Sequence, residues 1–204
     1  MKPTTALSRA KQLFHQHGGV LRASEANRLG IHSRTLNSMH QSGVLEQISK
    51  GLYRLSDMPL PTKPDLIITS KKIPQSIICL TSALSYHNIT TQIPRYVSLA
   101  VKQGSEPPRL KYPPIRVFWF SKKTFEDGIE IHEIDGIPVR IYSIERTIAD
   151  CFKYRNKIGL TIALEALKIY LRGKQPNIEI LMHYSSICRV AKILNYYLDA
   201  IINE

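Results

Sequence analysis

A cluster of prolines divides this chain into two parts. Pro59, Pro61 and Pro64 stand within six residues, and each fixes its own backbone angle and lacks an amide donor. Such a stretch is extended and stiff, as in a linker between domains. We therefore predict a first domain of residues 1–58, a linker of 59–64 and a second domain of 65–204. A chain of 204 residues has room for both.

The first 58 residues follow the element order of a winged helix-turn-helix. Apolar side chains recur at helical spacing from Leu7 to Phe14, and Gly18 ends that helix. Gly30 supplies a tight turn, and Ser33 is a suitable N-cap for the helix that follows it. Gly51 favours a tight hairpin turn. The predicted elements after the first helix are a short helix over 23–29, a helix over 34–42 and a hairpin of strands 44–48 and 52–55.

After the linker, strands in the middle of the sequence give way to helices at its end. Residues 129–134 alternate apolar and polar side chains, as a half-buried strand does. The other predicted strands are 77–80, 97–101, 116–120 and 139–142. The predicted helices are 65–72, 82–87, 144–152, 160–171 and a long one over 178–202. The predicted fold class is α+β: an N-terminal winged helix-turn-helix followed by a larger mixed α/β domain that ends in helices.

Basic residues outnumber acidic ones and are unevenly placed. The chain has 28 Lys and Arg against 16 Asp and Glu, so its net charge is +12. Residues 1–60 hold 8 basic and 3 acidic side chains, and residues 61–123 hold 10 and 2. Residues 124–204, with 10 and 11, are nearly neutral. An excess of this size in the first 123 residues favours a polyanionic partner, most simply nucleic acid.

The remaining composition is that of an ordinary globular protein, with 43% hydrophobic and 22% charged residues. The sequence offers no apolar stretch long enough for a transmembrane helix and no apolar segment near its start that predicts a secretory signal. Its three cysteines are widely spaced, which is typical of reduced thiols. We therefore expect a cytoplasmic protein that has no disulfide framework and no metal or cofactor site.

The second helix of a helix-turn-helix enters the major groove, where its outward side chains meet base edges. Arginine can bind guanine, and asparagine or glutamine can bind adenine, through two hydrogen bonds each. A lysine at the hairpin tip can contact phosphate. The predicted DNA-binding residues are Arg22, Arg28, Ser33, Arg34, Thr35, Asn37, Ser38, Gln41, Lys50 and Arg54.

A second basic segment lies between residues 94 and 123, where aromatic side chains are interleaved with cations. Basic and aromatic residues together can bind single strands by charge and stacking. We expect the aromatic residues to be strand core and the cations to face an anionic partner. The predicted anionic-partner surface is Arg95, Lys102, Arg109, Lys111, Arg116, Lys122 and Lys123.

Four short motifs, taken in order, indicate a family. They are Gly51-Leu-Tyr-Arg-Leu55, Ser82-Ala-Leu-Ser-Tyr-His-Asn-Ile-Thr90 with Ile93-Pro94, Tyr142-Ser-Ile-Glu-Arg-Thr-Ile-Ala-Asp-Cys151 and Ile162-Ala-Leu-Glu-Ala-Leu167. Behind a winged helix-turn-helix, this set resembles the AbiEi-type antitoxins of bacterial AbiE phage-defence (type IV) toxin–antitoxin systems. The resemblance covers nearly the whole chain.

The resemblance implies a function in two parts. The N-terminal domain would bind double-stranded DNA at inverted repeats in its own promoter and repress transcription. The C-terminal domain would counteract a nucleotidyltransferase-like toxin, directly or indirectly. The resemblance therefore implies an autorepressor and antitoxin without enzymatic activity.

Two other functions stay open. Glu130, Glu133 and Asp135 could hold Mg²⁺ in a nuclease, although the alternation puts Glu130 and His132 on one face of the strand and Glu133 on the other. The other alternative is an ordinary transcription factor that senses a ligand, which an apolar pocket with a few polar groups would support. Catalysis by Ser82 with His87 is not expected. Arg146 and Asp150 are spaced for a local ion pair on one helix.

Overall fold

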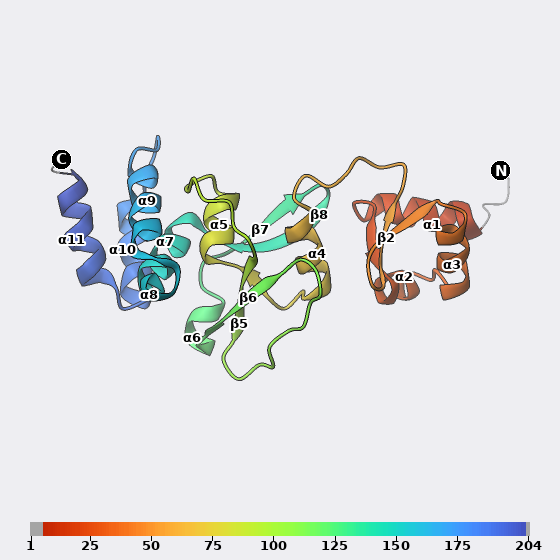
Figure 1. Cartoon of the computed structure of the whole chain (residues 1–204), viewed down its shortest axis with the longest axis horizontal. Coiled ribbons are helices and arrows are strands. Elements are labelled where there is room, and N and C mark those ends of the chain that lie inside the picture. The colour runs from red at the N-terminus through yellow and green to blue at the C-terminus, as the bar shows by residue number, and fades with distance from the viewer. Residues whose placement is uncertain (1–5, 203–204) are drawn as a thin grey trace. The chain divides into compact units, whose positions relative to one another are not determined.

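The computed structural model describes residues 6–202 of the 204-residue chain. Its secondary structure is mixed, with helices and two sheets (Figure 1). The chain divides into two compact units. The first consists of residues 1–74, 110–113 and 132–139, and the second consists of 75–109, 114–131 and 140–204. The predicted linker of 59–64 thus lies inside the first unit, and its role as a functional boundary stays a prediction.

The first unit contains four helices and a small sheet among its described residues. The helices are α1 (Ala6–Gln16), α2 (Ala23–Arg28), α3 (Ser33–Gln41) and α4 (Pro64–Lys72). The sheet is antiparallel, in the order β1-β3-β2, and its strands are β1 (Val20–Arg22), β2 (Leu45–Ser49) and β3 (Leu52–Leu55). Phe14, Leu21, Leu36 and Met39 form part of its core and are at most 2% exposed.

Strand β1 is absent from the sequence prediction. It has three residues, too few for a periodic pattern, and it forms because Val20 to Arg22 pair with Leu52 to Arg54 of β3. Two glycines at positive φ, Gly18 (φ 69°) and Gly19 (φ 74°), turn the chain from α1 into this strand. A side chain at Gly18 would meet Asp135 O and Ile137 Cγ1 at 2.8 Å, so only glycine fits there.

The larger sheet has five strands, in the order β6-β5-β4-β8-β7. Its central strand β4 pairs antiparallel with β5 and parallel with β8, whereas β5 and β6 are parallel. The strands are β4 (Ile77–Ile78), β5 (Val97–Lys102), β6 (Ile115–Phe120), β7 (Ile129–Ile134) and β8 (Ile137–Tyr142). Five of the six residues of β5 are buried, as expected of a strand inside a sheet.

Helices form the remainder of the second unit. Helix α7 lies at their centre and packs against α5, α9 and α10. Phe120, Tyr142, Phe152 and Leu194 are fully buried in the core that these elements share. The helices are α5 (Leu80–Tyr86), α6 (Lys122–Phe125), α7 (Ile144–Lys153), α8 (Arg155–Ile158), α9 (Leu160–Leu171), α10 (Ile178–Ile187) and α11 (Ala191–Ile202).

The prediction of one long helix over 178–202 is wrong. The helix ends at Ile187, and Arg189 adopts the left-handed conformation at φ 60°. The amide of Val190 then donates to Ser185 O at 2.8 Å, which closes the end of α10 and redirects the chain into α11. Glycine usually occupies such a position. Because the sequence has arginine there, apolar periodicity continues across the break and hides it.

The helices of the described residues do not meet the length and hydropathy needed to cross a membrane.

Candidate nucleic-acid interface

Helix α3 presents a polar face to solvent. Leu36 and Met39 anchor the opposite face, at 2% and 0% exposure. His40 lies on the same helix, and its Nδ1 is 3.1 Å from Leu45 O, so α3 is also fixed to β2. Thr35 is half-buried. The exposed residues of this face are Ser33, Arg34, Asn37, Ser38 and Gln41, as the sequence predicted.

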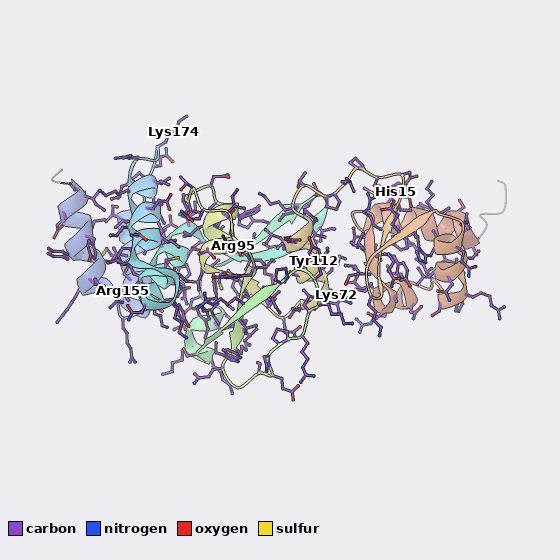
Figure 2. The ribbon with its side chains drawn as sticks, viewed as in Figure 1. His15, Lys72, Arg95, Tyr112, Arg155 and Lys174 are labelled. Atoms are coloured by element: carbon purple, nitrogen blue, oxygen red, sulfur yellow. The ribbon has the colours of Figure 1, made fainter. Side chains whose placement is uncertain are left out.

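A cluster of cations borders the hairpin of β2 and β3. Lys50 lies at its tip. Lys72, which is labelled in Figure 2, lies at the C-terminal end of α4 and donates from Nζ to Lys50 O. The pKa of the Lys72 ammonium is lowered, first by partial burial and then by the charges of Arg22 and Lys50. These three side chains therefore form one local concentration of positive charge, which we call the Lys50–Lys72 cluster. Like charges held together in this way favour an anionic partner.

Sequence analysis missed Lys72 because 65–72 was assigned to the second domain. Its neighbour Lys71 has a different environment. The Lys71 Nζ is 3.3 Å from Glu25 Oε2, and the same carboxylate accepts the Arg22 amide at 2.9 Å. Lys71 is therefore neutralised by an acid, and it differs from Lys72 in this respect. Arg28, on α2, is exposed as expected.

The assignment of Arg54 to the DNA-binding residues is wrong. Its side chain is only 5% exposed, because it lies between the hairpin and the chain segment that follows it. Nη1 donates to Met58 O at 2.7 Å and to Pro59 O at 3.1 Å, and Nη2 pairs with Glu46 at 2.7 Å. A guanidinium held in this way cannot reach a phosphate. Arg54 was predicted from a strand pattern that could not show which face of β3 would be covered.

Two cations of the basic segment of residues 94–123 contact other side chains of the protein. Lys102 pairs with Glu126 at 2.6 Å. The Arg116 Nη1 donates to Tyr96 Oη at 2.8 Å, and its guanidinium lies 5.4 Å from the ring centres of Tyr96 and Phe118. The exposed members of the set without an ion pair in the described structure are Arg95 (Figure 2), Arg109, Lys111, Lys122 and Lys123.

The aromatic residues of this segment divide into two groups. Phe118 and Phe120 are 3% and 0% exposed, which confirms the prediction that they belong to the core. For Trp119 and Tyr112 that prediction is wrong, because they are 45% and 56% exposed. Trp119 alternates with its neighbours along β6 and therefore faces outward, and its indole donates to Ser105 O at 3.2 Å.

The predicted ion pair of Arg146 and Asp150 is confirmed, and it is completely buried. Nε of Arg146 lies 2.9 Å from Asp150 Oδ2, and both side chains are 0% exposed. The thiol of Cys188 donates to the other carboxylate oxygen at 3.2 Å. Burial raises the pKa of Asp150, and the charge of Arg146 opposes that shift. The guanidinium centre lies 5.1 Å from the Tyr142 ring. This pair is an internal structural element and does not form a surface site.

The side chains of Ser82 and His87 both contact the backbone of other elements. Ser82 is buried, its Oγ donates to Tyr96 O at 3.2 Å, and it accepts the Ser98 amide at 2.8 Å. His87 Nε2 lies 2.8 Å from Tyr142 O. A backbone contact therefore engages each side chain. These contacts account for the positions of both side chains in the fold.

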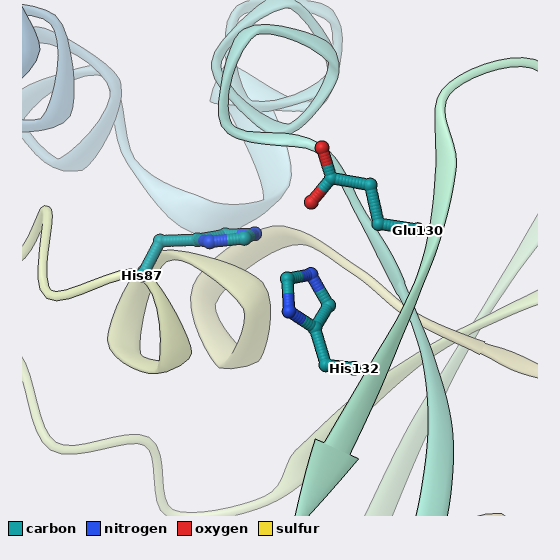
Figure 3. Close-up of side chains that lie close together, drawn as sticks. All are labelled: His87, Glu130 and His132. Atoms are coloured by element: carbon teal, nitrogen blue, oxygen red, sulfur yellow. The ribbon is translucent and has the colours of Figure 1, made fainter.

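The acidic residues on β7 and in the turn after it do not converge as a nuclease centre would require. Asp135 accepts the Thr62 amide at 2.7 Å, and within the described residues Glu130, Glu133 and Asp135 do not form a group of three metal ligands. Ligand atoms of His87, Glu130 and His132 do lie within 4.8 Å of one another (Figure 3). His87 directly follows α5 and is far from Glu130 and His132 in the sequence, so sequence spacing does not show that these three side chains meet.

The first unit thus carries an exposed polar face on α3 and a cluster of cations at the hairpin of β2 and β3. Residues 8–56 match the family described as "Transcriptional regulator, AbiEi antitoxin". The match confirms the resemblance to AbiEi-type antitoxin regulators over residues 8–56, a segment that includes one of the four motifs.

Among solved structures, the chain is similar to the crystal structure of the RV2827C protein from Mycobacterium tuberculosis, with a TM-score of 0.57 and 11% sequence identity. The alignment covers 89% of this chain and 71% of that chain. At this identity the likeness concerns the fold alone. No curated protein sequence matches the chain.

Proposed function

We propose that this protein is a winged helix-turn-helix autorepressor and the antitoxin of a nucleotidyltransferase-like toxin in a bacterial phage-defence system. The observation that carries the DNA-binding part is that one unit holds both the exposed polar face of α3 and the Lys50–Lys72 cluster. The family of residues 8–56 supports a transcriptional regulator. In this proposal the protein acts in the cytoplasm, without a cofactor and without catalysis.

In the proposed complex α3 lies in the major groove of the DNA. Arg34, at its first turn, would bind guanine O6 and N7, and Asn37 and Gln41 would bind adenine. Ser33, Thr35 and Ser38 supply further hydroxyl groups along the same helix. Lys50 and Lys72 would bind phosphates on one side of the groove, with Arg22, at the end of β1, and Arg28, at the end of α2, as further phosphate contacts. Two copies on inverted half-sites would block the promoter.

Arg34→Ala should weaken binding to the upstream DNA by about 1–3 kcal/mol and relax specificity at one base pair. Arg34→Lys is the matched variant, because lysine keeps the charge but lacks the planar fork that binds guanine at two atoms. We expect Arg34→Lys to retain nonspecific affinity while losing the same specificity. A shift assay on the native sequence and on single-base variants measures both. Unchanged specificity in the two variants would remove α3 from the interface.

Lys50→Ala and Lys72→Ala should each weaken binding to all sequences about equally and flatten the dependence on salt. Each lysine that contacts phosphate displaces counterions, so its loss should lower the slope of log K against log salt by about one. Lys71→Ala is the control, because its ammonium is already paired with Glu25. If the three variants had the same slope as the wild type, the Lys50–Lys72 cluster would not contact DNA.

The antitoxin activity is proposed for the second unit, which contains three of the four family motifs. Its exposed cations, including Arg95, Lys122 and Lys123, offer a surface to an anionic partner. Co-expression with the neighbouring open reading frame tests this activity when the toxin is driven by an unrelated promoter. A full-length Arg34→Ala/Lys50→Ala variant should then still restore growth, although it no longer represses. Loss of rescue in this variant would mean that protection depends on DNA binding.

A further inference from the structure

A cavity of about 240 Å³ lies within the first unit. Its walls come from β1, from the segment that follows β3, from α4 and from residues 135–137. Val20, Met58, Ile67 and Ile137 make most of this wall apolar. The volume is somewhat below the roughly 300–1,000 Å³ that accommodates drug-sized ligands, so the cavity suits a smaller molecule.

The cavity has few polar groups, and some of their atoms have hydrogen-bond partners whereas one does not. Asp135 accepts the Thr62 amide at 2.7 Å and the Thr62 hydroxyl at 3.1 Å. Arg54 also lines the cavity, and both of its terminal nitrogens are hydrogen-bonded. Its Nε is different: it is buried and, among the residues that the structure describes, it has no hydrogen-bond partner. A buried donor without an acceptor is destabilising, and an acceptor that reaches it would be bound.

The charges around the cavity decide what kind of acceptor fits. The guanidinium of Arg54 is already neutralised by Glu46 at 2.7 Å. The carboxylate of Asp135 is the other charged group of the lining, and it would repel an anion. A neutral carbonyl or amide oxygen is therefore preferred to a carboxylate. The apolar wall requires that the rest of the molecule be hydrocarbon.

We propose that this cavity is a binding site for a small, neutral, largely apolar molecule that carries one carbonyl or amide acceptor. The acceptor takes the hydrogen of Arg54 Nε, and the apolar body packs against Val20, Met58 and Ile137. Because Nε is covered in the free protein, the segment that begins at Met58 shifts slightly when the acceptor enters. Arg54 belongs to the hairpin that carries Lys50, so the site is connected to the proposed DNA-binding surface through a single strand pair.

The probe for this site is benzamide, an aromatic ring with a neutral amide, and toluene and benzoate are its matched comparisons. Full-length protein labelled with ¹⁵N and ¹³C is titrated and followed by NMR. Benzamide should shift the Arg54 Nε–H and Met58 methyl signals saturably. It should bind at least fivefold more tightly than toluene, which has no acceptor, and more tightly than benzoate, which is charged. The titration contains no DNA, so its result does not depend on the proposed function.

Two tryptophan variants locate the binding. Leu60 lines the cavity and is 79% exposed, so Leu60→Trp should fold and cover the cavity, reducing affinity for benzamide at least tenfold. Leu7→Trp, on α1 at an exposed position outside the lining, should bind benzamide as the wild type does. Arg54→Lys removes Nε–H and should abolish the preference for benzamide over toluene. An unmoved Arg54 Nε–H signal, or equal affinity in both tryptophan variants, would overturn the proposal.

Discussion

Replacing Asp150 with alanine should lower the free energy of unfolding of the second unit by about 3–5 kcal/mol, because it leaves a buried arginine without a counter-charge. Arg146 is 0% exposed, and Asp150 is its partner at 2.9 Å. The substitution also removes the acceptor of the Cys188 thiol. Urea unfolding followed by tyrosine fluorescence or circular dichroism measures the change.

The double variant Arg146→Met/Asp150→Ala is the control for this result. Methionine fills much of the same volume without a charge, so the double variant should recover most of the stability that Asp150→Ala loses. With the Arg146→Met single variant measured as well, the departure of the double variant from the sum of the two single effects gives the coupling energy of the pair. If Asp150→Ala and the double variant were equally unstable, lost packing rather than an unpaired charge would explain the effect.

We expect the stability of the first unit to be most sensitive to substitution of Phe14. This side chain is 0% exposed and lies in the same core as Leu36 and Met39, which fix α3. Phe14→Ala should cost about 3–5 kcal/mol, because it removes buried surface and leaves a cavity. A core this small has little stability to lose, so operator binding should disappear together with the folded unit.

Leu7→Ala provides the comparison on the same helix. Leu7 is 42% exposed, and its truncation should change stability by no more than about 0.5 kcal/mol. Rescue from the toxin by the Phe14→Ala variant would show that the two proposed activities have separate structural bases. Normal operator binding by a variant whose first unit has unfolded would be inconsistent with the DNA-binding proposal.

Much of the secondary structure could be predicted because the elements carry local patterns. Helix α9 and strand β7 have the residue ranges that periodicity predicted. Errors arose where no local pattern exists. Strand β1 is defined by its partner β3, and the break at Arg189 is defined by two backbone hydrogen bonds. The pattern of apolar residues along the sequence indicates neither the strand nor the break.

Part of the candidate site could also be predicted from local patterns, and part could not. The outward face of α3 follows from helical spacing, since Leu36 and Met39 fix which side is inward. Burial of Arg54 and the approach of Lys72 to Lys50 depend on how the chain returns after residue 58. Both contacts depend on the path of the backbone in three dimensions, and the residue pattern of a single sequence does not show that path.

The three cysteines have a practical consequence for measuring motion. Cys79, Cys151 and Cys188 all belong to the second unit and are at most 4% exposed. Burial raises the pKa of each thiol, so little reactive thiolate forms while that unit is closed. Reaction with a thiol reagent should therefore proceed only through opening of the second unit. The rate at which the reagent labels the unmodified chain therefore reports the rate of that opening, and no engineered cysteine is required.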